Sequence, residues 1–179
     1  MRELSLNILD IVENSVKAEA KIVYIDVIAK DNVLTISIKD DGKGMSEEFL
    51  SRVTDPYTTT RTTRKVGMGL PFLKMEAEMA GGTFDIRSKL GEGTVVTTTF
   101  AIDHIDRPPL GDLGETMSTL ISNGDEVEYV LHFVFKDTDF VFDTRELKAQ
   151  LDGVPMDEPE VLLFIKNYIR ENTPHGGLL

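Results

Sequence analysis

Hydrophobic and polar residues alternate along two short stretches near the start of the chain, and this alternation predicts a β-hairpin. Residues 21–28 alternate and are rich in valine and isoleucine, and residues 33–39 repeat the pattern after an Asp-Asn turn. Alternation of this kind places the apolar side chains on one face of each strand. The second strand is predicted to end at Asp40, so a carboxylate leads directly into the next loop.

A helical pattern precedes the hairpin. Residues 3–19 contain neither glycine nor proline, and their apolar positions recur at the spacing of one helix face. The opposite side carries polar residues spaced four, three, four and three apart, Glu3, Asn7, Asp10, Asn14 and Lys17. Such a stripe is typical of a solvated surface. It is also suited to a site, because Asn14 offers an oxygen ligand for Mg²⁺, Lys17 a charge for phosphate, and Asp10 a carboxylate that orients water.

Two glycine-containing stretches follow. The first, Asp-Asp-Gly-Lys-Gly-Met at residues 40–45, joins a carboxylate to closely approachable backbone, although the same spacing occurs in ordinary turns. The second, residues 55–70, holds five threonines and three of the 19 basic residues before a helix predicted from Leu70 to about Ala80. Amides at a glycine-opened helix start bind anions, and the hydroxyls and cations add donors for phosphate. A flexible polar loop is the alternative for this second stretch.

The remaining pattern predicts strands at 83–88 and 94–102, a Pro-Pro linker after residue 104, and a further α/β segment. That segment is predicted to contain a helix at 112–121, a hairpin at 127–143 and helices at 144–151 and 157–170. A capping box is expected at residues 157–160, and residues 172–179 are expected to be frayed. We find no catalytic motif here, although His104 could be a phosphoacceptor. The segment either completes the first sheet or docks a partner.

Composition narrows the class of protein. The chain has 31 acidic and 19 basic residues, a net charge of −12 and no long basic run, which disfavours nucleic-acid binding. The absence of cysteine excludes disulfides and thiolate metal sites, and the three histidines are scattered. Neither a signal peptide nor a run of membrane-spanning length is found. We therefore expect a soluble, cytoplasmic protein that does not act at a membrane.

The order of these motifs resembles the Bergerat fold of the GHKL superfamily, which contains gyrase-type topoisomerases, ninety-kilodalton heat-shock chaperones, histidine kinases, MutL and anti-sigma-factor serine kinases. The resemblance covers roughly residues 3–102. It implies an α/β two-layer sandwich in which helices cover one face of a mixed, mostly antiparallel sheet, with a small α+β appendage. We predict a histidine-kinase-like ATP-binding domain at residues 1–103. Residues 104–179 are predicted to be a C-terminal extension or partner-docking piece.

The resemblance assigns the residues around adenine. Asp40 matches the aspartate that takes the exocyclic amine of adenine. Gly42 and Gly44 match glycines that admit the base, and Met45 packs on it. Thr94, after the Gly-Glu-Gly turn, matches the threonine that supports adenine through water.

The resemblance also assigns the phosphate and metal side of the site. Asn14 matches the residue that coordinates Mg²⁺, and Lys17 matches a lysine that touches phosphate. Asp10 would be the general base. The lid and its glycine motif supply the other predicted nucleotide-binding residues, Tyr57, Thr58, Thr59, Arg61, Lys65, Gly67, Met68, Gly69 and Leu70.

Four departures from the family pattern modify these expectations. Lys65 replaces the first lid glycine of many kinases, and the chain starts at the helix, so the sheet edge must be covered in another way. No helical hairpin with a phosphoacceptor histidine precedes that helix, which disfavours a self-contained histidine kinase. Asp10 stands where ATPases and serine kinases commonly have glutamate and histidine kinases often have asparagine. Because a shift of about 1 Å costs about a hundredfold in rate, slow hydrolysis or transfer to a protein acceptor is expected, with Glu13 as another candidate acid.

Two functions remain open. One is a slow ATPase or a serine or histidine kinase-like regulator that uses Mg-ATP. The other is a non-catalytic module that senses ATP against ADP and regulates a protein partner.

Overall fold

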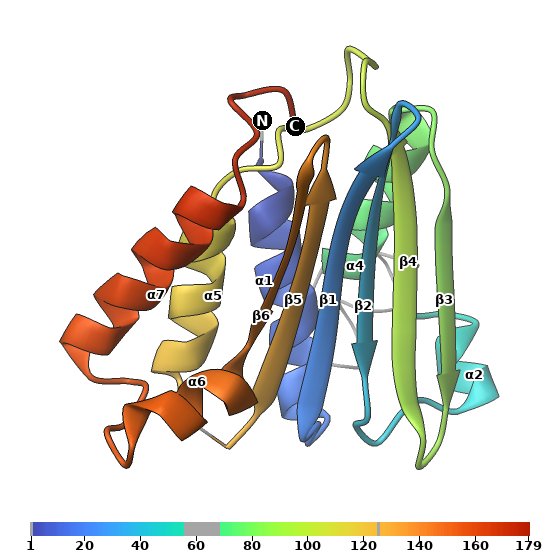
Figure 1. Cartoon of the computed structure of the whole chain (residues 1–179). Helices are drawn as coiled ribbons and strands as arrows, with labels where there is room; N and C mark the ends of the chain where they lie inside the picture. The colour runs from blue at the N-terminus through green and yellow to red at the C-terminus, as the bar shows by residue number, and fades with distance from the viewer. Residues whose placement is uncertain (1, 56–68, 125) are drawn as a thin grey trace.

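A six-stranded mixed sheet forms the centre of the protein. The computed structural model describes residues 2–55, 69–124 and 126–179. The strand order is β3-β4-β2-β1-β5-β6, and Figure 1 shows α1 and α4 behind the sheet, with α5 and α7 at its left. The elements in chain order are α1 Leu4–Lys17, β1 Ile22–Lys30, β2 Val33–Asp40, α2 Glu47–Leu50, α4 Gly69–Met79, β3 Phe84–Lys89, β4 Gly93–Ala101, α5 Leu113–Ser122, β5 Glu128–Phe135, β6 Thr138–Asp143, α6 Thr144–Leu151 and α7 Pro159–Asn172. The predicted two-layer sandwich is confirmed.

The first hairpin places the carboxylate at the end of β2 beside two other strands. β1 and β2 pair antiparallel, with Val23 opposite Asp40, and β2 pairs antiparallel with β4, with Asp40 opposite Thr94. Asp31 and Asn32 turn the hairpin with φ values of 52° and 62°. Positive φ at both turn positions suits the right-handed twist of the strands, and Asn and Asp tolerate it.

The C-terminal segment completes the same sheet. β5 pairs in parallel with β1 over Ile22–Ala29, and β6 pairs antiparallel with β5 (Figure 1). The β5–β6 hairpin of the C-terminal segment thus covers the edge of β1. The sequence analysis expected this edge to be covered in another way than by an earlier strand, and β5 covers it. The boundary at residue 103 stays a prediction.

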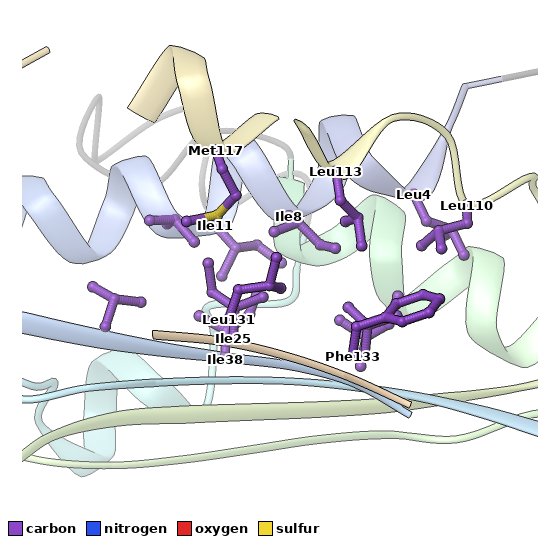
Figure 2. Packing of buried hydrophobic residues seen from close by; sticks show 14 of the residues in the cluster. Leu4, Ile8, Ile11, Ile25, Ile38, Leu110, Leu113, Met117, Leu131 and Phe133 are labelled. Atoms are coloured by element: carbon purple, nitrogen blue, oxygen red, sulfur yellow. The ribbon is translucent and has the colours of Figure 1, made fainter. Parts of the chain in front are cut away.

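The core lies between the sheet and the helices. Figure 2 shows Leu4, Ile8 and Ile11 of α1 facing the sheet beside Leu131 and Phe133 of β5. All five side chains are at most 4% exposed. Burying a side chain of this size stabilises the fold by about 1.5–3 kcal/mol. This packing fixes the position of α1, and therefore of its polar side chains, over the sheet.

Two expectations about the C-terminal segment are wrong. The residue before α7, Glu158, makes no side-chain cap bond, so there is no capping box; Pro159 opens the helix because its fixed φ suits the first turn. The chain end is docked rather than frayed. Leu179 is 1% exposed, and its carbonyl accepts a hydrogen bond of 2.8 Å from the Leu110 amide. Among the described residues, no helix has the length and apolarity needed to span a membrane.

Candidate functional site

The carboxylate of Asp40 is fixed by two hydrogen bonds at the end of β2. The side chain is 9% exposed. Its Oδ2 accepts from the Ser15 hydroxyl at 2.6 Å, and its Oδ1 accepts from the Gly42 amide at 2.8 Å. Each carboxylate oxygen can accept a further hydrogen bond, so Asp40 is oriented and still able to bind a donor.

Asp40 lines a small pocket between α1 and the sheet. Four parts of the chain contribute: α1, the end of β2 with the glycine loop, the start of α4, and β4. Most of the lining surface is apolar, and four polar side chains converge on it, which is the usual make-up of a small-molecule site. The lining residues are Ile11, Asn14, Ser15, Ala18, Asp40, Gly44, Met45, Leu70 and Thr94.

A hydroxyl network supports the far wall of this pocket. The Thr94 and Ser88 hydroxyls lie 2.8 Å apart, and the Met45 amide donates to the Ser88 hydroxyl at 2.8 Å. Ser88 also donates to the Gly93 carbonyl at 3.0 Å. The network ties the glycine loop to β3 and β4, so the loop cannot move independently of Thr94.

The glycines of the loop are required by packing. Gly44 has φ +71°, and a Cβ atom there would lie 2.0 Å from the Lys89 carbonyl oxygen. A Cβ at Gly42 would lie 2.8 Å from the Ala18 carbonyl oxygen. Both distances are shorter than van der Waals contact, so these glycines let the loop approach the end of α1 and the β3–β4 turn. Their role in admitting a base stays a prediction.

Asp10, the predicted base, lies beside the first residue of α4. A Cβ atom on Gly69 would be 3.3 Å from the Asp10 Cβ. The Asp10 carboxylate also forms an ion pair with Arg2, which donates to the Leu6 carbonyl as well. A helix N-terminus favours negative charge. A carboxylate, a guanidinium and the start of α4 therefore meet at one place.

The polar stripe of α1 faces α4 rather than solvent at Asn7. Asn7 is 1% exposed, its Nδ2 donates to the Glu76 carboxylate at 2.5 Å, and its Oδ1 is buried without a partner among the described residues. Burial raises the pKa of Glu76, against the opposing effects of the Asn7 hydrogen bond and the Arg2 charge.

The metal side of the site depends on Asn14. Within residues 2–55, 69–124 and 126–179, no group of three or more His, Cys, Asp or Glu residues could hold a metal ion. Asn14 lines the pocket, and its side chain carries an amide oxygen of the kind that binds hard cations. Mg²⁺ is commonly bound by one or two protein oxygens and by substrate phosphates, so this donor set fits Mg²⁺ delivered with a nucleotide.

The structure brings together six of the residues expected to bind nucleotide: Asn14, Asp40, Gly44, Met45, Leu70 and Thr94. Lys17 is exposed at the end of α1 and does not line the pocket, and Gly42 is buried behind it. Seven other candidates lie outside the described residues: Tyr57, Thr58, Thr59, Arg61, Lys65, Gly67 and Met68.

Sequence reasoning missed three residues of this region, Ser15, Ser88 and Arg2. Ser15 lies among the apolar positions of the first helix, where a hydroxyl between Ile and Val residues is a signal of a buried polar contact. Ser88 sits in a strand whose register with Thr94 is not visible in the sequence. Arg2 precedes the helix, and no local pattern links it to Asp10.

A helix-covered sheet with a strand-end aspartate and a pocket under α1 defines a class of nucleotide-binding domain. The family model described as "Histidine kinase-, DNA gyrase B-, and HSP90-like ATPase" matches residues 2–104. The chain belongs to this ATPase family.

The relatives that it resembles include sensor kinases. Histidine protein kinase DivJ of Caulobacter vibrioides is 33% identical over 107 residues, which cover 56% of this chain and 18% of DivJ. Sensor histidine kinase YvrG of Bacillus subtilis is 33% identical over 93 residues, which cover 49% of this chain and 16% of YvrG. The match therefore spans less than a fifth of the length of either relative.

Proposed function

We propose that the protein binds Mg-ATP in the Asp40 pocket and acts as a slow ATPase or kinase-like regulator of another protein. The observation that carries the proposal is the fixed Asp40 carboxylate in a mainly apolar pocket. An acceptor held in this way selects a ring that presents an amine beside an apolar face. The proposal also places the protein in the cytoplasm, where ATP is available.

Each residue then has a definite task. Asp40 would accept a hydrogen bond from the adenine amine, while Thr94 and Met45 bound the base. Asn14 would hold Mg²⁺, which neutralises phosphate charge when bound. The amides at the start of α4 would face the phosphates.

Asp10 would act on the attacking group. Its carboxylate is close enough to Gly69 to face a phosphate held at the α4 start. It would orient a water molecule, or a hydroxyl of a protein acceptor, and take its proton. Arg2 occupies the same carboxylate, so it must turn away or share it before Asp10 can accept a proton.

Phosphate release from Mg-ATP tests this proposal. Purified protein would be compared with an Asp10→Ala variant, and ATP binding would be measured on both. We expect slow turnover that falls at least about a hundredfold in Asp10→Ala while ATP binding is kept. Turnover that survives in Asp10→Ala would remove Asp10 from the reaction and direct attention to Glu13.

A second candidate is a non-catalytic sensor of ATP against ADP. The Arg2–Asp10 ion pair and the short aspartate in place of glutamate favour it. This candidate predicts tight, Asp40-dependent binding with no phosphate release above the background, even when Arg2 is replaced by Gln. Turnover gained in Arg2→Gln would instead support catalysis by a carboxylate that the arginine restrains.

A further inference from the structure

The outer edge of the sheet carries a groove far along the sheet from the Asp40 pocket. β6 is the last strand, and three consecutive β6 residues, Val141–Asp143, line the groove with side chains of α6 and α7. Among the described residues, no backbone hydrogen bond reaches Thr138–Phe142 from any element other than β5, and the Asp143 carbonyl accepts the first hydrogen bond of α6. Figure 1 shows β6 at the margin of the sheet beside α6 and α7. An open strand edge of this kind can pair with an added strand.

The groove is lined by aromatic and aliphatic side chains that remain exposed. Val141 is 52% exposed and Phe164 54%. The Phe164 and Tyr168 rings stack with centroids 5.5 Å apart, and Tyr168 also meets Phe140 edge to face at 5.5 Å. These rings hold one another in place without being covered, so they present a preformed apolar surface.

The charge around the groove is acidic. Residues 138–172 contain eight Asp and Glu residues against four Lys and Arg residues. The four cations all lie in ion pairs with carboxylates: Arg145 with Asp143, Lys148 with Glu128, Lys166 with Glu115, and Arg170 with Asp112. Glu146 lines the groove and is held by no ion pair among the described residues. The groove therefore favours a cationic ligand.

We propose that this groove binds an extended segment of a partner protein in which apolar residues alternate with Lys or Arg. The segment would pair with β6 as a seventh strand. Its apolar side chains would lie on the helix-covered face against Phe164. Its cations would lie on the opposite face, which Val141 shares with Asp139 and Asp143. The proposal specifies the docking surface of the regulator proposed above, and it requires no nucleotide.

A second copy of this chain fits the edge less well. An antiparallel β6–β6 pair centred on Val141 would set Asp139 of each copy opposite Asp143 of the other. Like charges directly opposite in a sheet are destabilising. Two chains of net charge −12 would also repel each other at long range.

The test uses a synthetic peptide that alternates valine with lysine, and a matched peptide that alternates valine with glutamate. Binding to the full chain without nucleotide would be measured by calorimetry, and hydrogen exchange would locate the protected amides. We expect the lysine peptide to bind with a Kd on the order of 10–100 μM, to protect β6 amides, and to weaken in 0.5 M salt. No binding of the glutamate peptide is expected.

Two variants test whether the lysine peptide binds in the groove. Val141→Lys places a cation on the edge, and Phe164→Ser removes the stacked ring; each should weaken the lysine peptide at least tenfold. Ile105→Lys, on a residue that is 89% exposed outside the groove, should leave the affinity unchanged. Circular dichroism and ATP binding on each variant check that the fold and the Asp40 pocket are intact.

Several results would overturn the proposal. They are no binding of the lysine peptide, equal binding of both peptides, protection at β3 instead of β6, or equal affinity in Val141→Lys. A dimer in sedimentation that Val141→Lys abolishes would make a second copy the occupant and would also contradict it. Loss of ATP binding in the Asp40 variant leaves these results unaffected, so the two proposals fail separately.

Discussion

Two polar residues of α1, Ser15 in the pocket wall and Asn7 beside α4, are almost completely buried. Ser15 donates to Asp40, and Asn7 donates to Glu76, both from the α1 face that packs on the rest of the fold. Buried polar groups are stable only when paired. The one unpaired oxygen of this set, Asn7 Oδ1, therefore marks a place where stability can be changed by one substitution.

Glu76→Gln should stabilise the protein at neutral pH. The amide keeps an acceptor for Asn7 Nδ2 and adds a donor for Asn7 Oδ1. Burial raises the folded-state pKa of Glu76, so the wild-type protein is more stable below the unfolded pKa of 4.5 and loses that stability as pH rises through the folded pKa. Since Glu76 is partly solvated, we expect a gain in Tm of roughly 1–3 °C at pH 7 that vanishes near pH 4.5.

Thermal unfolding between pH 4 and pH 8 checks this prediction. Glu78→Gln, on an exposed position of the same helix, is the matched control and should show no such pH-dependent gain. A Glu76→Gln variant that is no more stable than wild type at pH 7 would contradict the explanation.

At the scale of elements, the glycine loop between β2 and α2 is fitted between α1 and the β3–β4 turn. The Lys43 amide donates to the Ala18 carbonyl at 2.8 Å, and the Gly91 amide donates to the Lys43 carbonyl at 2.7 Å. The loop thus connects the end of α1, which lines the pocket, with the turn that leads into β4 and its pocket residue Thr94. Its backbone position decides where Met45 and Asp40 lie relative to each other.

Substitutions at two glycines of this region distinguish the cost of a steric clash from the cost of backbone strain. Gly44 and Gly91 both have positive φ, +71° and +81°, but a Cβ at Gly44 would strike the Lys89 carbonyl while nothing lies within 4 Å of one at Gly91. Gly91→Ala should cost only about 1 kcal/mol of unfolding free energy, from strain alone. Gly44→Ala should cost more than about 3 kcal/mol and weaken ATP binding. Equal losses in urea unfolding would show that the close approach at Gly44 does not matter.

Local sequence patterns predicted the helices and strands well, but they did not predict contacts between residues far apart in the sequence. The alternation at residues 33–39 ends β2 at Asp40, where the structure ends it, because a half-buried strand has an exact period of two. The glycines at 42 and 44 pointed to the loop for the same local reason. The parallel pairing of β5 with β1, and the contacts of Arg2 with Asp10 and of Ser15 with Asp40, join residues whose proximity no local period encodes.

At the scale of the whole molecule, the two ends of the chain close the fold together. β5 covers the edge of β1, and its Leu131 and Phe133 lie in the common core (Figure 2). The last residue packs beside Leu110, just before α5, and Arg107 donates to the Leu178 carbonyl at 3.1 Å. The C-terminal segment is therefore packed against α1 through α5, which contacts both α1 and α7.

This shared core predicts one cooperative unfolding transition for the full chain. A fragment of residues 2–103 would leave β1 as an open edge and expose the apolar side chains that β5 and α5 cover. We expect its Tm to fall by at least about 10 °C and the fragment to self-associate. Calorimetry and gel filtration check this. Two separate transitions in the full chain, or a monomeric fragment of unchanged Tm, would show that the sheet is not one unit.

The most direct test of the central claim is calorimetric binding of Mg-ATP to the wild-type protein, to Asp40→Asn and to Asp41→Asn. Asn at position 40 can keep the Ser15 and Gly42 contacts but offers the adenine amine a poorer acceptor. Asp41, which binds the Lys21 and Ile22 amides outside the pocket, is the control. We predict at least about a hundredfold weaker binding in Asp40→Asn, with an unchanged Tm, and wild-type affinity in Asp41→Asn. Equal affinity in Asp40→Asn and wild type would contradict adenine recognition by Asp40.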